Sequence, residues 1–198
     1  RRAIALNPAG AAGHYNLAQV LKARGRFTDE ATSLREAIRL DPGFALAHGN
    51  LGAALLDAGR ADQAEASLRQ ALALDPSATA THILLAHTLR DLGRLDEAAR
   101  AAEEAIRRAP PAERAAALAS LAQVRLQQGL AEAATSLLQD AVREPGVDPD
   151  IYRTYLASLL YQRGDAPQDR YERRRHFASF ARAATAAPFA NVPDPGRR

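Results

Sequence analysis

The stretch HYNLAQVLKARGRFTDEATSLREAIRLDP, residues 14–42, determines how this 198-residue chain is organised, because it recurs. Two further stretches superimpose on it without a gap, HGNLGAALLDAGRADQAEASLRQALALDP (48–76) and HILLAHTLRDLGRLDEAARAAEEAIRRAP (82–110), so the three copies start 34 residues apart. A fourth copy, LASLAQVRLQQGLAEAATSLLQDAVREP (118–145), follows two extra residues, and a weaker fifth copy has its glycine at Gly164. A fixed period of this length indicates an array of repeated supersecondary units.

Each copy is predicted to form two helices joined by a tight turn. A large residue followed by a small one on the first helix lets the second helix approach closely, at Leu17–Ala18, Leu51–Gly52, Leu85–Ala86 and Leu121–Ala122. A glycine then ends the first helix in a left-handed conformation, at Gly25, Gly59, Gly93, Gly129 and Gly164. Alanines form the packing stripe of the second helix, at Ala37, Ala64, Ala71, Ala98, Ala105, Ala134 and Ala141. Prolines end the second helix, at Pro8, Pro42, Pro76 and Pro110.

The composition agrees with helices and argues against several other classes of protein. Apolar residues make up 47% of the chain but aromatic residues only 5%, which does not suit a β-sandwich or barrel. Cysteine is absent, so there is no disulfide framework and no thiolate nucleophile or metal ligand. A net charge of +3 is a weak footprint for nucleic acid, and no apolar run is long enough to span a membrane. We therefore expect a soluble, cytoplasmic protein that binds neither nucleic acid nor membrane.

The period, the turn glycine and the closing Asp-Pro resemble the tetratricopeptide repeat (TPR) family over residues 1 to about 164. The resemblance implies an all-α, right-handed α-α superhelix whose first helices line a concave groove for a protein or an extended peptide. Two positions depart from the family pattern. Glu30 stands where a small residue belongs, which predicts a looser second helix there, and His14, His48 and His82 stand where the family often has tryptophan.

The chain is predicted to divide into four parts. Residues 1–8, RRAIALNP, align with the closing half of a repeat and are expected to be the end of a truncated upstream repeat. Residues 9–164 hold four clear repeats and a divergent fifth, 165–187 a C-terminal helix, and 188–198 a linker or tail. Because the chain starts inside a repeat and contains no methionine, we expect it to be a piece of a longer protein.

The side chains beside the packing leucines on the first helices are predicted to face a bound peptide in the groove. The first such column is Asn16, Asn50, Leu84, Ser120 and Tyr155, and the neighbouring one is Gln19, Ala53, His87, Gln123 and Ser158. A primary amide offers both a donor and an acceptor, so stacked asparagines could hold an extended main chain. Asn16 and Asn50 match the asparagine ladder of TPR arrays in O-linked N-acetylglucosamine transferases. The alternative is that Asn-Leu-Gly is simply common in TPR first helices.

Other TPR proteins clamp a terminal carboxylate with basic residues. The matching groove positions are held here by Tyr15, Ala80 and Leu84, so that clamp is missing. The three histidines cannot share one metal ion, because equivalent residues of adjacent repeats lie about 8–10 Å apart. No phosphate loop or nucleophile–base signature occurs, so we expect this part of the protein to have no catalytic residues, no metal and no cofactor.

The C-terminal stretch resembles a narrower group. SLLYQRGD (158–165), PQDRYERRRHFASFA (167–181) and NVPDPGRR (191–198) are similar to the segment that leads from the repeats into the catalytic domain of bacterial O-linked N-acetylglucosamine transferase-like (SPINDLY-type) proteins. This resemblance implies that the repeats recruit substrate proteins for a glycosyltransferase. Two alternatives stay open: a free-standing assembly scaffold without an attached enzyme, and an RNA-binding helical repeat of the pentatricopeptide kind.

Overall fold

The computed structural model of the protein describes residues 10–161, with the side chains of residues 10–159. Within this part every element of regular secondary structure is an α-helix, in the order α2 (Ala11–Ala23), α3 (Phe27–Leu40), α4 (Ala45–Asp57), α5 (Ala61–Leu74), α6 (Thr79–Asp91), α7 (Leu95–Arg108), α8 (Pro111–Gln127), α9 (Ala131–Ala141) and α10 (Pro149–Tyr161). The predicted all-α class is confirmed. The expectations for residues 1–8, 165–187 and 188–198, and for Gly164, lie outside the described residues.

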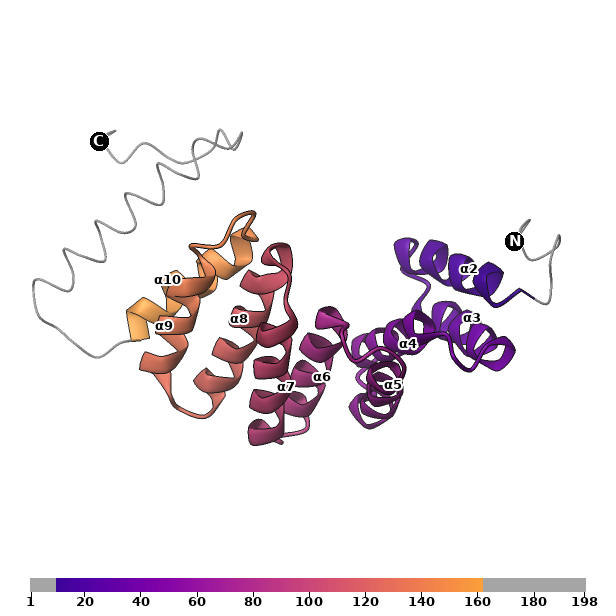
Figure 1. The fold of residues 1–198 in the computed structure, drawn as a ribbon, viewed down its shortest axis with the longest axis horizontal. Coiled ribbons are helices and arrows are strands. Elements are labelled where there is room, and N and C mark those ends of the chain that lie inside the picture. Colours follow the sequence, from indigo (N-terminus) through magenta and orange to yellow (C-terminus); the bar gives the residue numbers. More distant parts are fainter. Residues whose placement is uncertain (1–9, 162–198) are drawn as a thin grey trace, which may run out of the picture.

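The helices form four antiparallel pairs and the first helix of a fifth. Each pair joins the two helices of one repeat, α2 with α3, α4 with α5, α6 with α7 and α8 with α9. The second helix of each pair also packs against the first helix of the next, and α4, α6, α8 and α10 contact one another in succession. Figure 1 shows the resulting elongated array, with α2 and α10 at opposite ends.

The turn inside each repeat depends on a glycine with a positive φ. Gly25, Gly59, Gly93 and Gly129 have φ of 67°, 70°, 76° and 78°, as predicted. At the third turn the Gly93 amide donates to the Arg90 carbonyl at 2.9 Å and the Arg94 amide to the Leu89 carbonyl at 2.8 Å. These bonds satisfy carbonyls that the end of the helix leaves open. Gly146, between α9 and α10, has a φ of 71° that the repeat pattern did not indicate.

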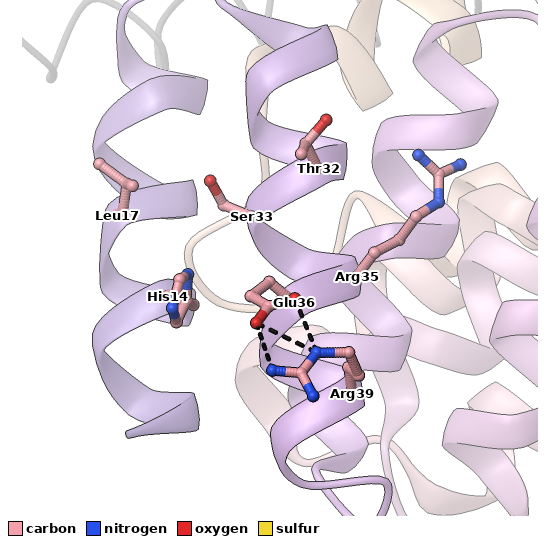
Figure 2. A pocket seen from close by; sticks show the side chains of 7 residues that line it. All are labelled: His14, Leu17, Thr32, Ser33, Arg35, Glu36 and Arg39. Carbon is pink, nitrogen blue, oxygen red and sulfur yellow. Dashed lines mark hydrogen bonds and ion pairs between the residues drawn. The ribbon is translucent and has the colours of Figure 1, made fainter. Parts of the chain in front are cut away.

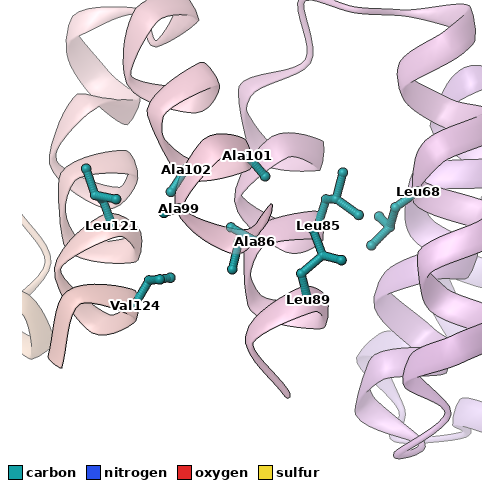
Figure 3. Packing of buried hydrophobic residues seen from close by; sticks show 10 residues of the cluster. Leu68, Leu85, Ala86, Leu89, Ala99, Ala101, Ala102, Leu121 and Val124 are labelled. Atoms are coloured by element: carbon teal, nitrogen blue, oxygen red, sulfur yellow. The ribbon is translucent and has the colours of Figure 1, made fainter. Parts of the chain in front are cut away.

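The core of the described residues is divided into three clusters along the array rather than gathered in one central mass. The middle cluster draws Leu68 from α5, Leu85, Ala86 and Leu89 from α6, four alanines from α7, and Leu121 and Val124 from α8. Figure 3 shows these side chains meeting across the four helices. Each repeat therefore buries its apolar face against its neighbours, as expected for an array whose units are not stable alone.

The two extra residues before the fourth copy lengthen a helix instead of forming a loop. α8 has 17 residues, whereas α2, α4 and α6 have 13 each. It begins at Pro111, and proline suits the first helical position because its missing N–H would have no partner there. α9 is shortened to 11 residues, against 14 in α3, α5 and α7.

The expectation of a looser second helix at Glu30 is wrong. α3 has the same 14 residues as α5, and its Leu34 and Ala37 are fully buried. Glu30 itself is only 1% exposed, and its Oε2 has no hydrogen-bond partner. The helix keeps its packing. The effect of having Glu30 in place of a small residue is that a carboxylate is buried away from water.

A charged network ties the second and third repeats together. Glu65 on α5 accepts contacts from Arg69 Nη1 at 2.5 Å and from Arg94 Nη1 at 2.6 Å. Arg94, directly before α7, also contacts Glu97 at 2.6 Å, and these two carboxylates raise its pKa. The Glu65 side chain is only 11% exposed, so the two arginines pair a carboxylate that lies almost out of water.

Replacing Glu65 by alanine is expected to lower the free energy of unfolding by about 1 kcal/mol, because Arg94 loses its contact to the preceding repeat. The Arg94 side chain is 38% exposed, so water limits the effect. Glu104→Ala is the matched control. Glu104 pairs with Arg107 and Arg108 on its own helix, so its loss should cost less than about 0.5 kcal/mol. Urea unfolding followed by circular dichroism measures both. Equal effects would show that the Glu65 network adds nothing between repeats.

Candidate peptide-binding surface on the first helices

The first predicted column separates into exposed and buried residues. Asn16 on α2 is exposed, and Asn50 on α4 and Leu84 on α6 are half-buried. Ser120 on α8 and Tyr155 on α10 are only 2% and 8% exposed. The column thus reaches the surface on the first three repeats and is covered on the last two.

Asn50 and Tyr15 meet across the first two repeats. The Asn50 Nδ2 donates to the Tyr15 hydroxyl at 3.0 Å, although the residues are 35 positions apart. Phe44, just before α4, tilts against the Tyr15 ring with their centroids 4.9 Å apart. The ring pair holds the hydroxyl in place, and the hydroxyl in turn orients the amide.

The first four side chains of the second column are partly exposed, and three of them are polar. Gln19, Ala53, His87 and Gln123 are all half-buried. Arg90 on α6 donates to the Gln123 side-chain oxygen on α8, which joins the third repeat to the fourth. Burial, and then the charge of Arg90, lower the pKa of His87. His87 is therefore a neutral hydrogen-bonding group at pH 7.

The last members of both columns contact the protein itself. Tyr155 packs in the cluster of α8, α9 and α10, and burial raises the pKa of its hydroxyl. Ser158 is buried and donates to the Tyr155 carbonyl at 2.7 Å, and the buried Ser120 Oγ has no partner among the described residues. The accessible residues with side chains long enough to contact a peptide are here called the first-helix surface: Tyr15, Asn16, Gln19, Asn50, Leu84, His87 and Gln123.

Three contributors to this surface were missed from the sequence. Phe44 and Arg90 contact predicted site residues, and Leu46 is 60% exposed. Leu46 precedes Asn50 by four residues on α4, so both lie on one face of that helix. The exposed leucine was not distinguishable from a core residue, since apolar residues occur on several faces of α4 and do not form a single stripe.

His48 and His82 contact the loops that connect successive repeats. His48 Nε2 lies 3.0 Å from the Pro42 carbonyl oxygen, and His82 Nε2 lies 3.0 Å from that of Pro76. Burial lowers the pKa of His82. Between residues 10 and 161 no three His, Asp or Glu side chains are placed to hold one metal ion. None of the helices described there has the length and hydrophobicity needed to cross a bilayer.

A separate cavity of about 490 Å³ lies between α2 and α3 at the end of the array. Its lining is His14, Leu17, Thr32, Ser33, Arg35, Glu36 and Arg39. Figure 2 shows His14 and Leu17 on α2 opposite the α3 side chains, with Glu36 and Arg39 paired to each other. None of the predicted site residues lines this cavity.

Two sequence models described as tetratricopeptide repeat match the chain, over residues 1–44 and 55–122. No curated protein matches it in sequence. Among solved structures, PilF of Pseudomonas aeruginosa superimposes with a TM-score of 0.75 at 22% identity, covering 87% of this chain and 75% of that one. A thermophilic TPR protein of Thermus thermophilus gives 0.68 at 20%, covering 80% and 86%. MamA of Desulfovibrio magneticus RS-1 gives 0.70 at 17%, covering 90% and 97%. These likenesses confirm the repeat superhelix.

Proposed function

Because the chain belongs to the tetratricopeptide repeat family, we propose that it binds an extended segment of another protein across the first-helix surface. The observation that carries this proposal is the pairing of Asn50 with Tyr15. Tyr15 occupies one donor hydrogen of the Asn50 amide, which leaves a second donor hydrogen and the acceptor oxygen for a guest. An extended peptide unit has one donor and one acceptor to match them.

The side chains around this amide favour a peptide that has both apolar and uncharged polar side chains. Leu46 and Leu84 offer apolar contacts on α4 and α6, whereas Gln19 and His87 offer neutral hydrogen-bonding groups. The carboxylate-clamp positions hold Tyr15, Ala80 and Leu84, which supplies no cation for a chain terminus. An internal segment that carries apolar side chains between its main-chain hydrogen bonds fits these groups best.

The double variant Asn16→Ala, Asn50→Ala is expected to bind such segments about thirtyfold more weakly, because it removes main-chain hydrogen bonds worth about 1 kcal/mol each, at least one at each position. The probe is an array of random twelve-residue peptides with blocked ends, and the affinities of the best binders are then measured by fluorescence polarisation. Gln70→Ala is the control, since it removes an exposed amide from the second helix α5. Equal affinity of the double variant and the wild type, with helicity retained, would refute the role of the asparagines.

We also propose the finer assignment, that the array recruits acceptor proteins for a glycosyltransferase. It rests on the resemblance of residues 158–198 to the linker of SPINDLY-type proteins, and most of that segment lies outside the described residues. Any sugar nucleotide would bind outside the array. The coding sequence beyond Arg198 tests the assignment: a sugar-nucleotide-binding domain there supports it, whereas a stop codon or an unrelated domain favours the free-standing scaffold.

A further inference from the structure

Arg90 places a positive charge beside the first-helix surface, where the third repeat meets the fourth. It follows His87 by three residues on α6, so the two side chains share one face of that helix. The Arg90 side chain is 21% exposed and donates to the Gln123 side-chain oxygen on α8. Besides burial, the charge of Arg90 lowers the pKa of His87, as expected for groups that lie close together. Arg90, His87 and Gln123 are here called the α6–α8 cluster.

The guanidinium of Arg90 is only partly used by the described residues. Its Nε and Nη2 atoms donate to the Asp91 carboxylate at 3.3 and 3.1 Å, and its Nη1 atom donates to Gln123. A guanidinium has five N–H groups, so one on each terminal nitrogen remains for a ligand. The Asp91 side chain is 45% exposed, and water therefore weakens its attraction for Arg90.

The neighbours of Arg90 in the α6–α8 cluster also offer mainly hydrogen-bond donors. Gln123 uses its side-chain oxygen to accept from Arg90, which leaves its amide nitrogen with two hydrogens to donate. The neutral His87 ring has one N–H to donate and makes no hydrogen bond to another described residue. Several donors around one positive charge match a carboxylate, because a carboxylate only accepts hydrogen bonds and carries the opposite charge.

We propose that the α6–α8 cluster binds an acidic side chain of the bound peptide. The proposal rests on the function proposed above, in which Asn50 holds the main chain of that peptide. Arg90 lies six residues beyond Leu84, the counterpart of Asn50 on α6, which is about 9 Å along the helix axis. α4 and α6 contact each other, and packed helices lie about 8–10 Å apart, so about 13 Å separates Asn50 from Arg90. About four residues of extended chain span that distance, so a twelve-residue segment reaches both.

The first test uses the random twelve-residue peptides with blocked ends. Blocked ends remove the terminal carboxylate, so any acid that binds is a side chain. We expect the tightest binders to contain Asp or Glu, and replacement of that residue by its uncharged amide should weaken binding about tenfold in fluorescence polarisation. Tight binders without an acid, or a change of less than about twofold on amide replacement, would overturn the acidic site and leave main-chain binding at Asn50 intact. An array in which no blocked peptide binds would overturn both proposals.

Three variants of the protein test whether Arg90 carries the preference. Arg90→Gln should reduce the preference for the acid over its amide from about tenfold to less than about twofold, since only the acidic peptide loses an ion pair. Asp91→Asn should tighten binding of the acidic peptide about threefold, because it removes the carboxylate that competes for the guanidinium. Arg100→Gln is the control, because it removes the same charge from an exposed position on the second helix α7. An unchanged preference in Arg90→Gln with helicity retained, weaker binding in Asp91→Asn, or an equal loss in Arg100→Gln would overturn the proposal.

Discussion

Replacing Leu68 by alanine is expected to lower the free energy of unfolding by about 3 kcal/mol, the largest loss at any single side chain in the middle cluster. Leu68 is fully buried and lies in the cluster shared by α5, α6, α7 and α8. It also fills the space left by Gly52, because a Cβ added at Gly52 would lie 2.5 Å from the Leu68 Cγ. Truncation therefore opens a cavity at the contact of α4 with α5 and next to α6. Urea unfolding followed by far-UV circular dichroism measures the loss.

The effect should depend on Gly52 in a way that a general loss of hydrophobicity would not. In the Leu68→Ala background, Gly52→Ala should recover about 1 kcal/mol or more, since it adds a methyl group to the cavity and removes a glycine from a helix interior. In the wild type the same substitution gains less, because Leu68 must move first. Leu74→Ala is the control on α5: that side chain is 40% exposed and its truncation should cost under about 0.5 kcal/mol. An equal effect of Gly52→Ala in both backgrounds would contradict this account.

The period in the sequence was sufficient to predict the helices and their turns. In each copy a glycine followed by a new apolar pattern marks the end of the first helix. The backbone at Gly25, Gly59, Gly93 and Gly129 has the positive φ that this tight turn requires. The period could not show how an irregularity is absorbed. The two residues before the fourth copy could have formed a loop, and Pro111 allowed them to begin a longer α8 instead.

The candidate site was less predictable than the fold because exposure depends on neighbouring repeats. The column position was the same for Asn50 and for Ser120, yet only Asn50 keeps part of its side chain in solvent. The contact between Asn50 and Tyr15 joins residues 35 positions apart, and no local pattern announces it. The sequence predicted the two columns of side chains. In the structure, the accessible members of these columns are those on the first three repeats and Gln123.

Replacing Glu30 by alanine is expected to stabilise the protein at pH 7 by about 1–2 kcal/mol, since it removes a buried carboxylate oxygen that has no partner. The corresponding residues of the next three repeats are Ala64, Ala98 and Ala134, and all are fully buried. The position therefore accepts alanine elsewhere in the array. Lys22 is near enough to lessen the cost of the charge, but it does not outweigh the loss of water around the carboxylate.

The sign of the pH dependence follows from the direction in which the pKa of Glu30 moves. Burial raises that pKa above the ordinary value of 4.5, with the charge of Asp57 adding to the increase and that of Lys22 opposing it. Well below pH 4.5 the side chain is protonated in both folded and unfolded chains, so its burial carries no cost from charge. As pH rises, the unfolded chain ionises first, so the wild type loses stability until pH exceeds the folded pKa. The advantage of Glu30→Ala should grow over that interval and then stay constant.

Glu36 provides a control of opposite sign on the same helix. Its hydrogen bonds from Arg39 lower its pKa, so its stabilising contribution is present above pH 4.5 and fades as pH falls through the folded pKa. Urea unfolding of wild type, Glu30→Ala and Glu36→Ala at pH 4, 5.5 and 7.5 should then give two trends in opposite directions. A constant difference between wild type and Glu30→Ala would mean that Glu30 titrates alike in both states, and its burial would then be a matter of shape alone. A difference that grows with pH would show that the first repeat carries a buried charge where its neighbours carry a methyl group.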